Sequence, residues 1–228
     1  MKLLSQILSI AIFAMLPLQA SSADSTSSSV SEWDLEADNE DLAIEVFTRS
    51  VGDSPLKEFK GVTFIKAPVT AFVALLEDTK RATQWMHNVI QFDMVEEISD
   101  TEKVVYTVNE TPWPVTDRDV YVHSSFVADS KGAVTSHLRA QGGHTKNDDF
   151  VRMPSIQGKW EFTPQDDGMT KVVYQVHADP GGSLPDWLVN AIVVDTPLNT
   201  LENLHEVIHD EQYQDKEYDF INKAIAAD

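Results

Sequence analysis

The stretch HADPGGSLPDWLVN, from His177 to Asn190, marks the place where a strand ends and a long helix begins. Gly181 and Gly182 suit a tight turn because glycine adopts a positive φ without a steric penalty, and Pro180 cannot continue a strand ladder. Pro185 fits the first turn of a helix, where its missing N–H is not needed. The stretch therefore predicts a sharp turn that swings a C-terminal helix back over the preceding fold.

The helix expected after this turn spans Leu184 to His209 and is amphipathic. Pro197 lies near its middle and predicts a bend. One apolar stripe recurs at three- and four-residue spacing, which is typical of a helix that buries one face. Its members are Leu184, Trp187, Leu188, Ala191, Ile192, Val194, Leu198, Leu201, Leu204 and Ile208.

The chain ahead of the turn has the pattern of an antiparallel sheet. Alternating and β-branched residues predict a hairpin over 41–49 and 57–66, then six strands over 90–98, 103–108, 119–127, 133–140, 156–162 and 171–177. Pro68 begins a segment of helical spacing that predicts one or two short helices between the hairpin and the six strands. An antiparallel sheet with one apolar face needs a cover, and only the last helix is long enough. The fold class is therefore α+β, a curved antiparallel sheet around a long C-terminal helix.

The N-terminus has the pattern of a secretory signal peptide. Lys2 precedes an apolar stretch and then small residues, with Ala23 or Ala20 as the cleavage position. We expect a signal peptide over 1–23, a Ser-rich flexible leader over 24–31 and one domain over 32–228. The chain has no cysteine, so an oxidising compartment such as the periplasm requires no disulfides of it.

Charge limits the partners that this chain can have. The 228 residues carry 17 basic and 37 acidic side chains, a formal net charge of −20 at pH 7. Such a surface repels phosphate backbones, so nucleic acid is a poor partner, and any membrane contact should be brief, apolar, or bridged by divalent cations. The sequence says nothing about oligomeric state.

Four segments in order resemble the START family of lipid-transfer domains. They are EDTKRATQWMHNV (77–89), TPWPVTDRDVYV (111–122), VRMPSIQGKWEFTP (151–164) and HADPGGSLPDWLVN (177–190). The resemblance is greatest to the branch that contains phosphatidylcholine-transfer proteins. The phosphate-binding arginine of that branch falls here on Ala82, beside Arg81.

The resemblance implies a helix-grip fold with a hydrophobic tunnel for one lipid or sterol-like molecule, bound without catalysis or cofactor. We expect the C-terminal helix and the loop around Trp113 to gate the tunnel. Trp113 stands at its mouth, either as a gate or membrane-touching tip or packed back on the core. We expect ligand contacts from Trp113, Arg139, Trp187, Leu188, Ala191, Ile192, Leu198, Leu201 and His205. Arg118 and Asp119 are expected to form a structural pair, and His123, His137 and His177 lie on strands with one inward face.

The segment HEVIH (205–209) has the letters of a zinc-protease motif. Two histidines one helical turn apart can bind zinc, and Glu206 would polarise a bound water. A catalytic site also needs a third ligand, and Asp215 stands where the usual histidine would be. The alternative to a binding protein is therefore a helix-grip enzyme, either a zinc hydrolase through His205, Glu206 and His209 or a cyclase-like catalyst, and we expect neither.

Overall fold

The computed structural model describes residues 31–52, 54 and 56–227. The predicted signal peptide and residues 24–30 of the predicted leader lie outside the described residues. Across the described part, no helix is both long and apolar enough to cross a bilayer.

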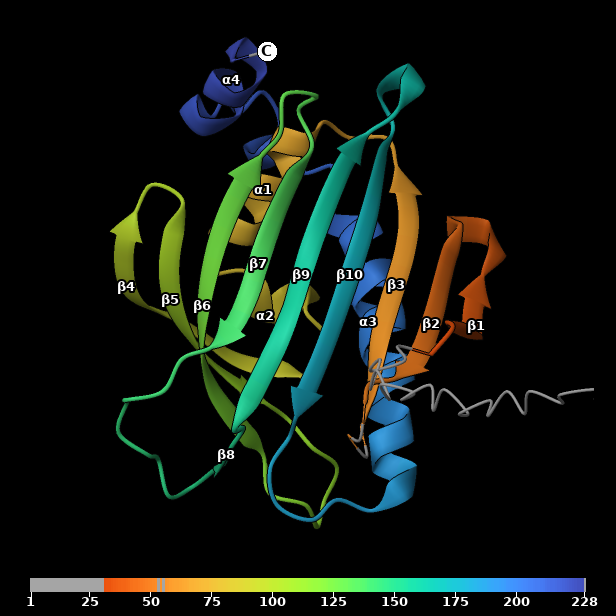
Figure 1. The fold of residues 1–228 in the computed structure, drawn as a ribbon, viewed down its shortest axis with the longest axis vertical. Coiled ribbons are helices and arrows are strands. Elements are labelled where there is room, and N and C mark those ends of the chain that lie inside the picture. The colour runs from red at the N-terminus through yellow and green to blue at the C-terminus, as the bar shows by residue number, and fades with distance from the viewer. Residues whose placement is uncertain (1–30, 53, 55, 228) are drawn as a thin grey trace, which may run out of the picture.

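One curved sheet of ten strands forms the body of the fold (Figure 1). Along the sheet the order is β1-β2-β3-β10-β9-β7-β6-β5-β4, with antiparallel neighbours, and β8 pairs parallel with β6. The strands are β1 (Asp34–Asn39), β2 (Ile44–Ser50), β3 (Lys57–Ile65), β4 (Val89–Ser99), β5 (Glu102–Asn109), β6 (Arg118–Ala128), β7 (Val134–Ala140), β8 (Val151–Arg152), β9 (Ser155–Pro164) and β10 (Thr170–Asp179). The β3–β10 pairing joins the N-terminal strands to the later meander.

Within the described residues, four α-helices accompany the sheet. They are α1 (Val69–Glu77), α2 (Ala82–Trp85), α3 (Asp186–Val207) and α4 (Asp219–Ala226). In Figure 1, α1, α2 and α3 lie behind the strands, while α4 stands at one end of the sheet. The α+β helix-grip architecture expected from the sequence is therefore confirmed.

Three elements were not expected from the sequence. Strand β1 reads DLEADN, and its acidic, largely exposed side chains hide the alternation that marks a half-buried strand. Strand β8 has two residues, too few for any periodicity. Helix α4 is amphipathic and buries Ile221 in the core, so the spacing of its apolar residues could have predicted it.

Helix α3 continues through Pro197, where the sequence predicted a bend. A proline inside a helix lacks the N–H for one backbone hydrogen bond. Packing offsets this cost, because Pro197 is buried and faces β3 at Gly61.

The main core lies where α3 packs on β2 and β3 and where α1 packs on β9. Leu201 and Leu204 of α3, and Ile208 directly after its last residue, are fully buried and join the cluster of Ile44 and Val46 on β2. The stripe at three- and four-residue spacing therefore has a packing role along this part of the helix.

Gly61 on β3 is what allows α3 to approach the sheet closely. A Cβ atom built at this position would lie 2.7 Å from Leu201 Cδ1 and 3.3 Å from Pro197 Cβ. Any side chain at residue 61 would therefore push the helix away from the sheet.

We predict that Gly61→Ala destabilises the protein by about 1–3 kcal/mol through overpacking, and Leu201→Ala by about 2–5 kcal/mol through a cavity. The double variant should lose less than the sum of the two, because the shortened side chain makes room for the new methyl group. Urea denaturation measures all three. Gly142→Ala is the control, since nothing lies within 4 Å of its Cβ position. Strictly additive losses would contradict the close contact.

Candidate functional site

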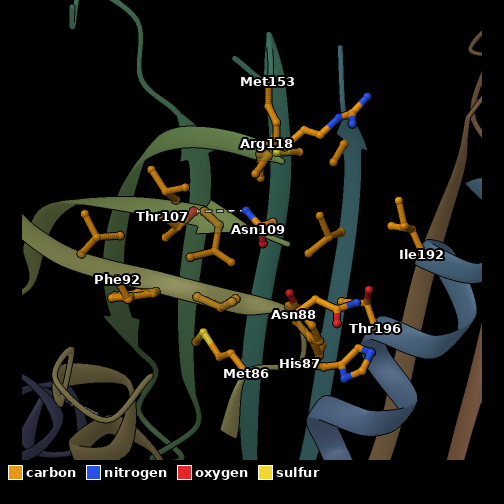
Figure 2. Close-up of a pocket in the computed structure, with 18 of the residues that line it drawn as sticks. Met86, His87, Asn88, Phe92, Thr107, Asn109, Arg118, Met153, Ile192 and Thr196 are labelled. Carbon is orange, nitrogen blue, oxygen red and sulfur yellow. Dashed lines mark hydrogen bonds between the residues drawn. The ribbon is translucent and has the colours of Figure 1, made fainter. Parts of the chain in front are cut away.

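A cavity lies between the inner face of the sheet and α3 (Figure 2). Its walls come from β3, β4, β5, β6, β7, β9 and β10, from residues 86–88 after α2, and from Ile192 and Thr196 of α3. The atom-free space, open mouth included, is about 1250 Å³. Most of the lining side chains are apolar, so the cavity suits a hydrophobic occupant.

Strand alternation decides which residues line the cavity. On β7, Ser136 and Leu138 face the cavity, while His137 and Arg139 are exposed on the outer face. Arg139 therefore does not reach the cavity, and its expected ligand contact is wrong for this conformation. The sequence showed the alternation but not which of the two faces points inward.

The loop over 110–117 and the turn over 180–185 lie at the same end of the sheet, below β8 as drawn in Figure 1. Gly181 and Gly182 have φ of 69° and 64°, so the turn uses the backbone freedom that the sequence indicated. Glu110 and Thr111 of the loop and Pro180 of the turn line the cavity. We call this end of the cavity, formed by the loop and the turn, its mouth.

Arg118 holds the loop and the turn together. Its guanidinium donates to the carbonyl oxygen of Thr116, and to those of Pro180 and Gly181 at 3.4 Å each. The side chain is 4% exposed, and this burial lowers the pKa of the guanidinium. Arg118 thus lines the mouth as a buried cation whose hydrogen bonds go to backbone carbonyls (Figure 2).

The expected Arg118–Asp119 pair is not formed. Consecutive strand residues point to opposite faces, so Asp119 turns away from Arg118. Its carboxylate instead accepts two hydrogen bonds from Arg152, from Nε at 2.9 Å and from Nη2 at 2.8 Å, and one from the Tyr106 hydroxyl at 3.1 Å. The Asp119–Arg152 pair joins β6 to β8. Arg118 therefore has no part in this pair, and its side chain lies at the mouth.

At the other end of the cavity lies Lys103, the second residue of β5. It lines the cavity, is 9% exposed, and donates from Nζ to the carbonyl oxygen of Leu76 at 3.0 Å. Burial lowers the pKa of this ammonium group. Ser124 and Ser136 line the cavity nearby and share a hydrogen bond of 3.0 Å between their hydroxyl oxygens.

Aromatic rings form the wall on β3, β9 and β10. Tyr174 stacks on Trp160 at 4.0 Å between ring centroids and meets Phe59 edge-on at 5.1 Å. The surroundings of Tyr174 raise the pKa of its phenol to about 12, with burial as the cause. The three rings give the cavity a flat apolar side against which an extended or polycyclic molecule can pack.

The wall that faces α3 is partly polar. His87, Asn88 and Thr196 lie together there in Figure 2. Burial lowers the pKa of the His87 ring, and its backbone N–H donates to Thr200 Oγ at 3.1 Å. This segment therefore ties the end of α2 to α3 beside the cavity.

The α3 residues expected to contact ligand divide into two groups. Ile192 lines the cavity (Figure 2). Leu201 and Leu198 belong to the core cluster over β2 and β3, and neither Leu188, which is buried, nor Ala191 is among the lining residues. The side chain of Trp187 lies outside the described structure. The apolar stripe of α3 therefore includes both core residues and a cavity-lining residue. Its periodicity alone could not tell the two apart.

Trp113 stands at the mouth end but outside the cavity. Its side chain is 91% exposed, on the loop between β5 and β6. Of the two positions considered for this ring, the structure places it in solvent rather than against the core.

The zinc-like motif is explained by packing. His205 Nε2 lies 2.8 Å from Thr63 Oγ1, and burial lowers the pKa of the ring. His205 does not line the cavity, Glu206 is exposed, and His209 lies beyond the end of α3. Within the described residues no three His, Cys, Asp or Glu side chains form a group able to hold a metal.

The strand histidines also lie outside the cavity. His123 Nε2 lies 3.4 Å from a Glu102 oxygen, His137 is exposed, and His177 Nε2 lies 3.1 Å from Ser54 Oγ. Arg81 is likewise occupied, in an ion pair of 2.6 Å with Asp210. Lys103, Ser124 and Ser136 are among the polar lining residues that were not predicted from the sequence. The sequence feature that could have indicated them is a polar residue at a strand position where the alternation otherwise places apolar residues.

Comparisons with known proteins agree with this geometry. The START domain family model matches residues 18–209. An uncharacterized protein of Pseudomonas aeruginosa is 37% identical over 174 residues, which cover 76% of this chain and 85% of that protein.

Solved structures share the fold. A STAR-related lipid transfer protein from Xanthomonas axonopodis is 38% identical, with a TM-score of 0.71 over 77% of this chain and 98% of that chain. Human STARD10 superposes with a TM-score of 0.67 at 20% identity, over 77% of this chain and 72% of that one, which speaks for the fold alone. The match of the family model over most of the sequence, together with these relatives, shows that the chain belongs to the START domain family.

Proposed function

We propose that this protein binds one lipid or sterol-like molecule in the cavity, without catalysis, and passes it to or from a membrane. The observation that carries the proposal is the apolar cavity between sheet and α3, in a chain 38% identical to a STAR-related lipid transfer protein. Ligand pockets are concave and mostly apolar with a few polar groups, and the lining of this cavity has that character. Binding would draw on apolar area, at about 25 cal/mol per Å² removed from water.

We propose that part of the mouth moves when a lipid enters the cavity. Arg118 joins the loop over 110–117 to the turn that begins α3, so release of its two bonds of 3.4 Å would let the turn and the loop separate. We propose that this movement, with the N-terminal part of α3, is the gate. The hydrophobic tunnel expected from the sequence is then the cavity with its mouth open.

Membrane contact would occur at the mouth. Trp113 is exposed on the loop whose Glu110 and Thr111 line the cavity, and tryptophan favours the interface between lipid and water. The net charge of −20 opposes docking through anionic lipids, so contact would be brief and apolar. Export to the periplasm, which residues 1–23 indicate, would place the protein between two membranes.

We predict that Leu138→Trp, which fills the cavity, weakens binding of Nile red by about tenfold or more, whereas His137→Trp on the outer face leaves it unchanged. The two variants place the same ring one residue apart on opposite faces of β7. Fluorescence titration measures binding, and circular dichroism checks that both variants fold. Equal affinities would contradict the proposal that the cavity is the binding site.

We predict that Trp113→Ala slows transfer of a fluorescent lipid between phosphatidylcholine vesicles several-fold, with little change in affinity measured in solution. The reason is that the variant loses a membrane contact and keeps the cavity. Ile225→Ala is the matched control, since Ile225 is also exposed but lies on α4 at the opposite end of the sheet (Figure 1). A transfer rate that stays equal to that of the parent would overturn the role of Trp113.

A further inference from the structure

The cavity contains a cation that has no counter-charge in contact with it. Within the described part of the chain, Lys103 Nζ has one hydrogen bond, to the carbonyl oxygen of Leu76, and no carboxylate within ion-pair distance. An ammonium group has three donors and is costly to bury unless they are satisfied. Lys103 therefore has donor capacity left over at the cavity wall.

The acidic groups nearest to Lys103 act from a distance. Glu77 and Glu97 favour its charged form, but burial outweighs them and the net effect lowers its pKa. Glu77 Oε2 accepts a hydrogen bond of 2.8 Å from the Tyr218 hydroxyl, and Glu97 is exposed on β4. The ring of Phe126 also faces the ammonium, 5.8 Å from Nζ to its centroid. None of these groups replaces a direct anionic partner.

Two hydroxyl groups lie on the same inner face. Lys103 is in register with Ser124 on β6, and Ser124 is hydrogen-bonded to Ser136 of β7. All three side chains are buried, and all three line the cavity. A polar row thus crosses the sheet at this end of the cavity, with the ammonium at one end of it.

Starting from the proposed binding function, we propose that the ligand is a hydrophobic monocarboxylic acid whose carboxylate contacts Lys103 while its apolar body extends toward the mouth. Lys103 and Asn109, near the mouth, lie six residues apart on β5, a span of about 20 Å along a strand. An apolar body of roughly this length packs against the aromatic wall. At this end of the cavity one cation, Lys103, matches the single charge of a carboxylate, whereas the bidentate fork of donors that arginine offers a phosphate is occupied at the mouth, where Arg118 binds backbone carbonyls.

The charge of the whole protein does not prevent such a ligand from binding. Fields from surface carboxylates are screened beyond about 8 Å at physiological ionic strength, whereas Lys103 acts inside a low-dielectric cavity. Selection between an acid and an uncharged lipid of the same shape would therefore depend on this one side chain.

The test compares cis-parinaric acid with its methyl ester, which differ in charge and little in shape. The parent protein should bind the acid about tenfold or more tightly than the ester, as expected for a charge-assisted hydrogen bond. In Lys103→Met this preference should fall to within about threefold, with ester affinity retained. Lys159→Met is the control, since Lys159 lies on β9 beside Glu161, outside the cavity lining, and should keep the full preference.

The outcomes separate this inference from the proposed function. Equal binding of acid and ester by the parent protein, or an undiminished preference in Lys103→Met, would overturn the carboxylate assignment and leave lipid binding intact. Failure of the parent protein to bind either probe would instead contradict the proposed function. Hexadecyl phosphate displacing the probe more effectively than palmitate would also overturn the assignment. The comparison on the parent protein needs no variant, so it holds even where Lys103→Met does not fold.

Discussion

The contact between α3 and β3 at Gly61 is the constraint on which the rest of the structure depends. Leu201 and Pro197 occupy the space that a side chain at residue 61 would fill, so the helix lies close to β1, β2 and β3. Because α3 packs on that half of the sheet, the α3 residues that line the cavity, among those described, are Ile192 and Thr196. A curved sheet wider than its cover leaves a hollow, and that hollow is the cavity.

The cavity is not uniformly apolar, and its polar groups have different consequences. Arg118 satisfies its donors with backbone carbonyls of the loop and the turn, so it serves the mouth. Lys103 sits at the far end with a single carbonyl acceptor, so it is available to an occupant. Since burying a cation costs more than burying apolar surface, each position needs its own explanation. The donors of Arg118 are satisfied by backbone carbonyls of the fold, whereas those of Lys103 are available to the ligand that we propose.

The architecture was largely readable from the sequence, whereas the site was not. Some features depend on residues close together in the sequence, so the sequence alone reveals them. They are the turn over 179–185, the strand alternation and the apolar stripe of the last helix. Which face of β7 points inward, and whether Leu201 packs on Gly61 or lines a cavity, depends on contacts between residues far apart in sequence. For this reason Ile192 was identified together with neighbours that belong to the core, Arg139 was assigned to the wrong face, and Lys103 was missed. In the HEVIH segment, the contact between His205 and Thr63 at the edge of the apolar stripe gives the first histidine a packing role.

The most direct test of the central claim, that the cavity holds one hydrophobic molecule, is a native mass spectrum of the protein purified gently from its host. The account predicts a single adduct of lipid mass, in a one-to-one complex, that disappears on extraction with organic solvent. A chain that stays at its bare mass, even after incubation with a total lipid extract of the host, would contradict it.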